Sequence, residues 1–122
     1  MTKRQAALLE RVEGWLDSQS GASARDAARA LHLPDQAAEA VVSLGVEAKR
    51  LVRIGPIVVT ARAFRVLVDR LAEAVGDRPF QPRELRDALG VTRGWGEGFA
   101  LALEAHGLLV REPGGWRLKQ VE

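Results

Sequence analysis

The sequence predicts a mostly α-helical fold with small β-hairpins, an α+β chain of two tandem winged-helix domains. In residues 81–119, two helical segments flank a turn at Gly90, and two short β runs follow, joined by residues 113–115. A helix-turn-helix followed by a two-stranded wing is the element order of a winged helix. Residues 1–60 show the same order. We therefore expect a first domain at 1–60 and a second at 61–122.

The composition is that of a globular chain without disulfides. Hydrophobic residues make up 47% and charged residues 28% of 122 positions, which are values typical of folded domains. No apolar run approaches the roughly 18 residues of a membrane span, and the N-terminus lacks a signal-peptide core. The absence of cysteine excludes thiolate chemistry and favours the cytoplasm. We expect a monomer that makes no contact with membranes.

The charge pattern gives only a weak indication of nucleic-acid binding. The chain carries 18 basic and 16 acidic residues, and the two kinds are interleaved along its length. Nucleic-acid-binding domains usually show a clear basic stripe or patch. The net charge of +2 therefore does not decide between a nucleic-acid and a protein partner.

Cap signals define the helices of the first repeat. Thr2 and Gln5 form a capping box, and Ser23 and Asp26 are predicted to form a second one. Pro34 is suited to the first turn of the third helix, where a missing N–H costs nothing. The first repeat is expected to contain three helices and a hairpin, at residues 3–18, 24–31, 34–49 and 51–59.

The second repeat is predicted from the same kinds of signal. A long amphipathic helix follows Thr60, the next helix starts at Gln81-Pro82, and Thr92 caps the third. The wing is expected at residues 108–111 and 116–118. The inward face of the third helix is predicted to consist of Trp95, Phe99, Ala102, Leu103 and His106.

The two repeats match when the sequence is shifted along itself so that Ala30-Leu31 falls on Ala88-Leu89. With the same shift, Val52-Arg53 falls on Val110-Arg111. The turn after the second helix and the entry into the wing stay in register without a gap. The shared order of elements favours an internal duplication over coincidence.

The sequence offers little catalytic chemistry. The two histidines, His32 and His106, have no Cys, Asp or Glu at ligand spacing on a shared face, so no metal site is expected. No serine lies beside a base for a nucleophilic triad. The glycines at 94, 96 and 98 follow a helix, whereas phosphate-loop motifs follow a strand. We expect neither an enzyme nor a cofactor.

The start of the third helix in the second repeat is the predicted nucleic-acid site. A helix-turn-helix presents this region, here Thr92, Arg93, Gly94 and Trp95, to its target. The N–H groups there favour a phosphate, and Arg93 can add a bidentate contact. The glycines are interpreted as room for a nucleic-acid backbone. Trp95 could stack on an unpaired base, although its spacing to Phe99 favours the core.

Basic residues of the second wing extend this predicted site. Arg111 and Arg117 flank the wing and Lys119 follows it, although a solvated surface charge is an equally good explanation of each. The third helix of the first repeat carries acids that would repel phosphate. The first repeat is therefore expected to be a spacer or a protein-contact module. Its acids are Asp35, Glu39 and Glu47.

Residues 86–95, RDALGVTRGW, resemble a motif of the bacterial selenocysteine-specific translation elongation factor. In that family, an Arg-Asp-x-Leu-Gly-x-Ser/Thr-Arg-Lys-aromatic run lies in the last winged-helix domain. The turn at Gly107, the strand with Arg111 and the arginine beside Leu118 continue the likeness. Residues 51–54 and the long helix that follows are similar to the family's preceding domain.

The resemblance implies binding to the selenocysteine-insertion hairpin of an mRNA, chiefly by the last winged helix. In such a factor, the GTPase and tRNA-binding domains lie earlier, and nothing in these 122 residues resembles them. The chain would then be a C-terminal fragment or a stand-alone relative. Two departures concern the site. Gly94 stands where the family has lysine, and Glu97 and Gly98 stand where it is apolar, which leaves Arg93 as the basic residue carried over.

Two other functions remain open from the residues alone. A DNA-binding regulator would use the same helix, prefer duplex DNA to an RNA hairpin and form a symmetric dimer. A protein-interaction scaffold of tandem winged helices would agree with the near-neutral charge. The scaffold predicts nucleic-acid binding with a flat response to salt.

Overall fold

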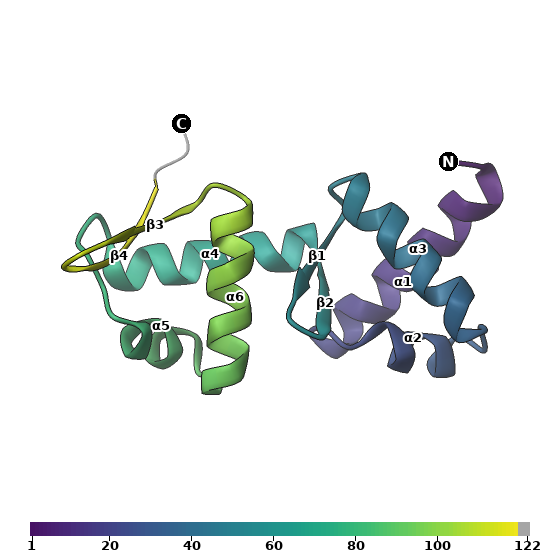
Figure 1. Cartoon of the computed structure of the whole chain (residues 1–122). Coiled ribbons are helices and arrows are strands. Elements are labelled where there is room, and N and C mark those ends of the chain that lie inside the picture. The colour runs from purple at the N-terminus through teal and green to yellow at the C-terminus, as the bar shows by residue number, and fades with distance from the viewer. Residues whose placement is uncertain (120–122) are drawn as a thin grey trace. The chain divides into compact units, whose positions relative to one another are not determined.

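The computed structural model describes residues 1–119 and contains helices and two separate antiparallel hairpins (Figure 1). This architecture confirms the predicted fold class. Within the described residues, no helix is long and apolar enough to cross a membrane. In chain order the elements are α1 (Lys3–Gln19), α2 (Ala24–Ala30), α3 (Asp35–Glu47), β1 (Leu51–Ile54), β2 (Ile57–Thr60), α4 (Ala61–Val75), α5 (Pro82–Leu89), α6 (Arg93–Ala105), β3 (Leu109–Glu112) and β4 (Gly115–Leu118).

The structural repeat has the offset that the sequence predicted. The shift that places Ala30 on Ala88 also places the start of α3, Asp35, on the start of α6, Arg93. With the same offset, α2, β1 and β2 recur as α5, β3 and β4. An isolated bridge joins the wing to the chain before the second helix in each repeat, Ala22 to Val58 and Phe80 to Trp116. The residues therefore form two copies of one fold.

The chain forms two compact units, Met1–Phe64 and Arg65–Glu122, and the boundary between them lies inside α4. Each unit has its own buried cluster, and burying a large aliphatic or aromatic side chain stabilises a fold by about 1.5–3 kcal/mol. Unit 1 buries Leu9, Val12, Leu16, Val41, Val42, Leu51 and Val58. Unit 2 buries Leu71, Phe80, Leu85, Phe99, Leu103, Leu109 and Leu118.

Most of the predicted caps are present. In the first capping box, the Thr2 N–H donates to Oε1 of Gln5 at 2.8 Å, and the Gln5 N–H donates to Oγ1 of Thr2 at 3.1 Å. The second box is only half formed. Ser23 Oγ accepts from the Asp26 N–H at 3.1 Å, but the shorter aspartate side chain returns no bond. Pro34 is the N-cap in an extended conformation, so α3 begins one residue later than predicted.

The predicted inward position of His106 is wrong. Leu103 is fully buried, but His106 is exposed and is the C-cap residue of α6. The chain leaves the helix at Gly107, whose φ of 71° lies in the left-handed region. The helical spacing counted from Phe99 therefore does not predict the position of the His106 side chain.

Candidate nucleic-acid interface

The N-terminus of α6 is open, as expected for the presented helix. Thr92 is the N-cap, and its Oγ1 accepts from the Trp95 N–H at 3.3 Å. Within residues 1–119, the N–H groups of Arg93 and Gly94 have no such acceptor, as is usual for the first helical positions. The Arg93 side chain is 82% exposed and lies 3.7 Å from a carboxylate oxygen of Glu97. Two N–H groups and one exposed guanidinium therefore face solvent together.

The three glycines of α6 do not all make room for a partner, in contrast to the prediction. At Gly94 an added Cβ would meet nothing within 4 Å, which agrees with room for a partner. Gly96 and Gly98 are buried inside unit 2. A Cβ at Gly96 would lie 2.9 Å from Cγ of Arg86, so this glycine makes room for the arginine stem rather than for a nucleic-acid backbone.

Trp95 packs within unit 2. Its ring stacks on Phe99 with centroids 5.5 Å apart and planes 23° apart, and it is half-buried. The helical spacing of Trp95 and Phe99, which favoured a core position for Trp95, thus predicts the main contact of its ring. One part of the indole remains accessible beside the start of α6.

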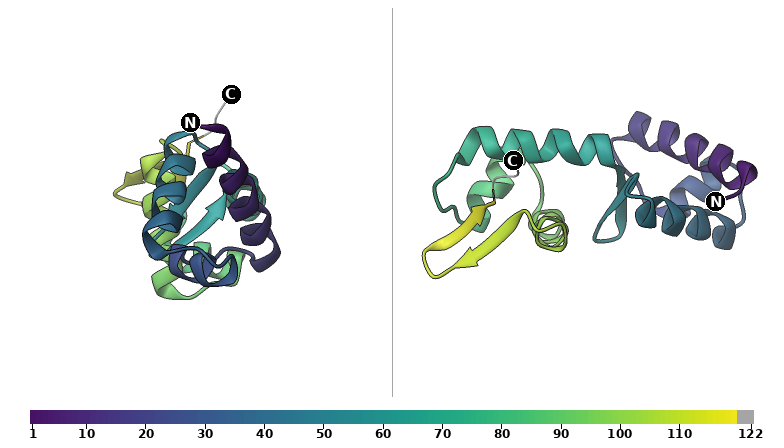
Figure 2. Two further views of the ribbon diagram at one scale, coloured as in Figure 1. Left: turned by 90° about the vertical axis from the view of Figure 1, so that its right-hand side faces the viewer. Right: turned by 90° about the horizontal axis from the view of Figure 1, so that it is seen from above.

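The strand register places the two wing arginines on opposite faces. Arg111 pairs with Trp116, and Arg117 pairs with Val110, the neighbour of Arg111. Side chains alternate between the faces of a strand, so Arg111 and Arg117 point to different sides of the ribbon seen in Figure 2. They cannot contact the same group of a bound ligand.

The outer face of the wing carries the remaining predicted cations. Arg117 lies 3.3 Å from a carboxylate oxygen of Glu112. Lys119 is exposed, and its backbone N–H donates to the Leu108 carbonyl at 2.8 Å. These side chains provide charge at the rim and do not line the pocket described next.

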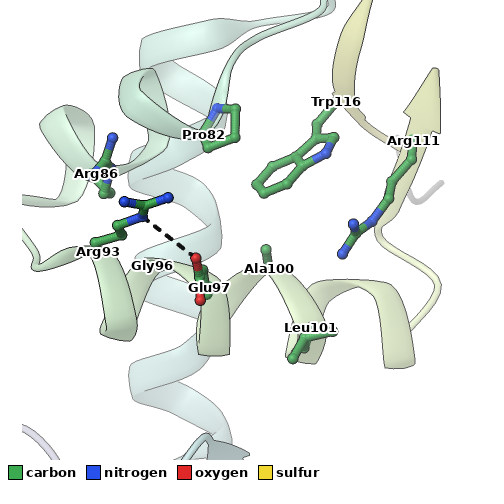
Figure 3. A pocket seen from close by; sticks show the side chains of 9 residues that line it. All are labelled: Pro82, Arg86, Arg93, Gly96, Glu97, Ala100, Leu101, Arg111 and Trp116. Carbon is green, nitrogen blue, oxygen red and sulfur yellow. Dashed lines mark ion pairs between the residues drawn. The ribbon is translucent and has the colours of Figure 1, made fainter. Parts of the chain in front are cut away.

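A pocket of about 520 Å³ lies between α5, α6 and the inner face of the wing (Figure 3). It brings together Arg93 and Arg111 from the predicted site and adds Trp116 and Arg86, the first residue of the run at 86–95, neither of which is among the predicted site residues. The Arg111 guanidinium lies 5.2 Å from the centroid of the Trp116 ring. The pocket is lined by Pro82, Arg86, Arg93, Gly96, Glu97, Ala100, Leu101, Arg111 and Trp116.

The pocket cations differ in their partners. Arg111 donates to both carboxylate oxygens of Glu104, at 2.8 and 3.3 Å, and Arg93 lies beside Glu97. For Arg86, no ion pair occurs in the part of the chain that the structure describes, and its Nε is buried without a hydrogen-bond partner. Trp116 could have been found from its place opposite Arg111 in a hairpin. The burial of Arg86 has no signal in the sequence.

Hydrogen bonds fix the walls of this pocket. The Phe80 N–H donates to the Trp116 carbonyl at 2.7 Å, and the Trp116 N–H donates to the Phe80 carbonyl at 2.8 Å. Next to this bridge, Gln81 Nε2 donates to the Gly114 carbonyl at 3.2 Å. The start of α5 is thereby tied to the wing that carries Arg111.

A charged cap holds the first turn of α5. The Gln81 N–H donates to Glu84 Oε2 at 2.8 Å, and Arg78 donates to Glu84 Oε1 at 3.0 Å. These two hydrogen bonds, with the Gln81 N–H the larger cause, lower the pKa of Glu84. The carboxylate therefore stays ionised near neutral pH and keeps the helix that carries Arg86 capped.

Unit 1 keeps an equivalent of only one of the three pocket arginines. At the repeat offset, Ala28 corresponds to Arg86 and Asp35 corresponds to Arg93. The equivalent of Arg111 is Arg53, whose guanidinium lies 2.6 Å from Glu39. The two copies thus share their fold and differ in charge at the helix start.

The residues described by the structure contain no cluster of three or more His, Cys, Asp or Glu side chains that could hold a metal ion. The interface is built from guanidinium groups, one carboxylate and an indole. Such groups bind and orient anions and aromatic rings.

Comparison with protein-family models and with curated protein sequences finds no match. Two solved structures resemble the chain over 98% of its length. One is the crystal structure of the bacterial selenocysteine-specific elongation factor EF-Sec, with a TM-score of 0.70 and 21% identity, of which the chain spans 19%. The other is the mRNA-binding domain of elongation factor SelB from E. coli in complex with SECIS RNA, with a TM-score of 0.77 and 16% identity, of which it spans 100%. The likeness confirms the tandem winged-helix fold.

Proposed function

We propose that the chain is the RNA-binding module of a selenocysteine-specific elongation factor and that unit 2 binds an mRNA selenocysteine-insertion hairpin. The main support is the match over 98% of this chain to an mRNA-binding domain whose structure was solved with SECIS RNA. The run at 86–95, recognised from the residues alone, points to the same family. The module would act as a monomer in the cytoplasm, and GTP hydrolysis would belong to a different domain of the factor.

The proposed contacts follow from the chemistry of unit 2. The N–H groups at the start of α6 and the Arg93 guanidinium would bind backbone phosphates. Trp116 offers an indole face on which an unpaired base could stack, and Arg111 holds one side of that ring. Arg117 and Lys119, on the outer face, would add charge that attracts RNA without reading its bases.

The ion pairs of these arginines do not oppose binding strongly. Arg93 and Glu97 are an exposed pair four residues apart on a helix, and such pairs stabilise proteins by about 0–1 kcal/mol. A charge-assisted bond from arginine to phosphate is of comparable or greater strength. A phosphate can therefore displace the Glu97 carboxylate at small cost.

Replacing Arg93 with alanine is expected to weaken hairpin binding by about 1–3 kcal/mol, because one charge-assisted contact is lost. Titration of a labelled selenocysteine-insertion hairpin in a gel-shift assay measures this directly. Thermal unfolding should change little, because the side chain is 82% exposed. Unchanged affinity would remove Arg93 from the interface.

A matched control is available in α4. Arg65 is 80% exposed and pairs with Asp69 four residues on, so Arg65→Ala removes the same charge in a similar local setting. It lies outside the pocket. Hairpin affinity should fall clearly less for Arg65→Ala than for Arg93→Ala. Equal losses would mean that only net charge matters.

One observation favours a second function, the protein-interaction scaffold. Arg93, Arg111 and Arg117 each lie within ion-pairing distance of a glutamate, so the predicted cations are largely neutralised in place. A surface of this kind suits a polar protein partner as well as RNA. Nucleic-acid binding that is weak and insensitive to salt would favour the scaffold.

A further inference from the structure

Among the described residues, Arg86 is the pocket-lining cation whose buried nitrogen has no hydrogen-bond partner. Its Nε lies beneath the surface, and no acceptor among residues 1–119 reaches it. A buried donor without a partner destabilises a fold, so native proteins rarely keep one without a use. Arg93 and Arg111, in contrast, each have a glutamate nearby. The pocket therefore holds an unsatisfied donor on a charged group that fold stability does not explain.

The fold makes room for this arginine. Gly96 lies where any side chain would come within 2.9 Å of the Arg86 stem, and Gly96 is buried. At the equivalent positions of unit 1, one repeat earlier in the chain, the pair is Ala28 and Ala38. Unit 2, which has the predicted cations, therefore carries an arginine packed against a glycine where unit 1 carries two alanines. Both differences serve to place a guanidinium at the pocket.

We propose that this pocket binds one backbone phosphate of the RNA strand and that Arg86 anchors it, with Arg93 as the outer donor. The proposal rests on the proposed function and names a contact for it. Figure 3 shows the three guanidinium groups around the pocket, with Glu97 paired to Arg93. Three cations and one carboxylate line the space, so its charge favours an anion.

The volume is consistent with a phosphate and its neighbouring sugar. A site of 520 Å³ falls within the range of about 300–1,000 Å³ that is usual for small-ligand sites, which is more than one phosphate fills. The apolar wall formed by Pro82, Ala100 and Trp116 lies beside the charged groups and suits a ribose. A phosphate at Arg86 would accept from the terminal nitrogens of the guanidinium, which make no hydrogen bond or ion pair among residues 1–119, because the Nε itself is covered.

Arg86→Met tests the anchor while keeping the aliphatic stem that packs against Gly96. Because this variant removes an unsatisfied buried donor, its unfolding midpoint should equal or exceed that of the native chain. Its affinity for a labelled selenocysteine-insertion hairpin should fall at least about tenfold, and Arg86→Lys should recover only part of the loss because lysine lacks the planar fork. Arg83→Ala is the control, since Arg83 is on the same helix, 83% exposed and outside the pocket.

Methylphosphonate linkages, which remove the charge of single phosphates, identify the contact. With the native chain and with Arg83→Ala, one linkage should weaken binding about tenfold when neutralised, and with Arg86→Met the same change should have a clearly smaller effect, because only the outer donor remains. Native affinity in Arg86→Met, or a linkage effect of undiminished size in it, would overturn the anchor and leave the proposed function standing. If removal of one base, rather than of one phosphate charge, weakened binding by the native chain but not by Arg86→Met, the phosphate contact would be overturned. That result would show that the pocket takes a base. Absence of hairpin binding by the native chain would overturn both proposals.

Discussion

Replacing Phe99 with alanine is expected to destabilise unit 2 by about 3–5 kcal/mol, the usual cost of truncating a fully buried phenylalanine. Phe99 is 0% exposed, and its ring stacks on Trp95. The substitution removes both a large apolar surface and the support of the indole next to the helix start. Because unfolding free energies of small domains are only about 5–15 kcal/mol, a large part of the margin would be lost.

Urea unfolding followed by circular dichroism measures this loss. Leu101→Ala is the control on the same helix, because the Leu101 side chain is 59% exposed. Its effect on the free energy of unfolding should stay within about 0.5 kcal/mol, as is usual for surface substitutions. RNA binding by Phe99→Ala should fall together with the folded fraction. A loss below about 1 kcal/mol would mean that α6 is not held by this core.

Gly115→Ala is expected to cost about 2–4 kcal/mol, from backbone strain and from weakened hydrogen bonds to the wing. The φ of Gly115 is 135°, a conformation that residues with a side chain rarely adopt. An added Cβ would also lie 2.8 Å from the Phe80 carbonyl oxygen, which accepts from the Trp116 N–H. The substitution should therefore loosen the bridge that holds Trp116 and Arg111 at the pocket.

Gly114→Ala is the matched control, because a Cβ there meets nothing within 4 Å. Unfolding midpoints and hairpin affinities of the two variants should be compared side by side. Gly115→Ala should lower both, whereas Gly114→Ala should leave both near native values. Equal behaviour of the neighbouring glycines would show that the wing is not fixed by the contact with Phe80.

Local signals in the sequence were sufficient to predict the elements. The capping box at Thr2, the N-cap at Thr92 and the turn at Gly90 depend on neighbouring residues, so the helix ends followed from short patterns. The repeat offset then related every element of one unit to an element of the other, from α2 and α5 onward. Predictions failed where the chain leaves regular geometry, as at His106.

The composition of the site depended on contacts between distant residues. The burial of Arg86 depends on Gly96, which belongs to the next helix, and no local pattern shows that the Nε lacks a partner among the described residues. The opposite faces of Arg111 and Arg117 follow only from the strand register. The Arg93–Glu97 ion pair, in contrast, follows from a spacing of four residues on one helix, which the sequence shows directly.

The repeat explains why one unit carries the proposed function. Both copies keep the same elements, but the pocket position of Arg86 is Ala28 in unit 1, and Asp35 takes the place of Arg93. Acids near the start of α3 disfavour a phosphate there. Charge substitutions on a shared scaffold, rather than a different fold, distinguish the proposed reader from the spacer.

A competition experiment with the native chain tests the central claim most directly. A labelled selenocysteine-insertion hairpin is challenged with unlabelled hairpin or duplex DNA at about 50 and about 200 mM salt. We predict that the hairpin competes at least about tenfold better than duplex DNA and that its affinity falls about 40-fold between the two salt concentrations, as expected for roughly three phosphate contacts. Equal or better competition by duplex DNA, or binding that is unaffected by salt, would contradict the account.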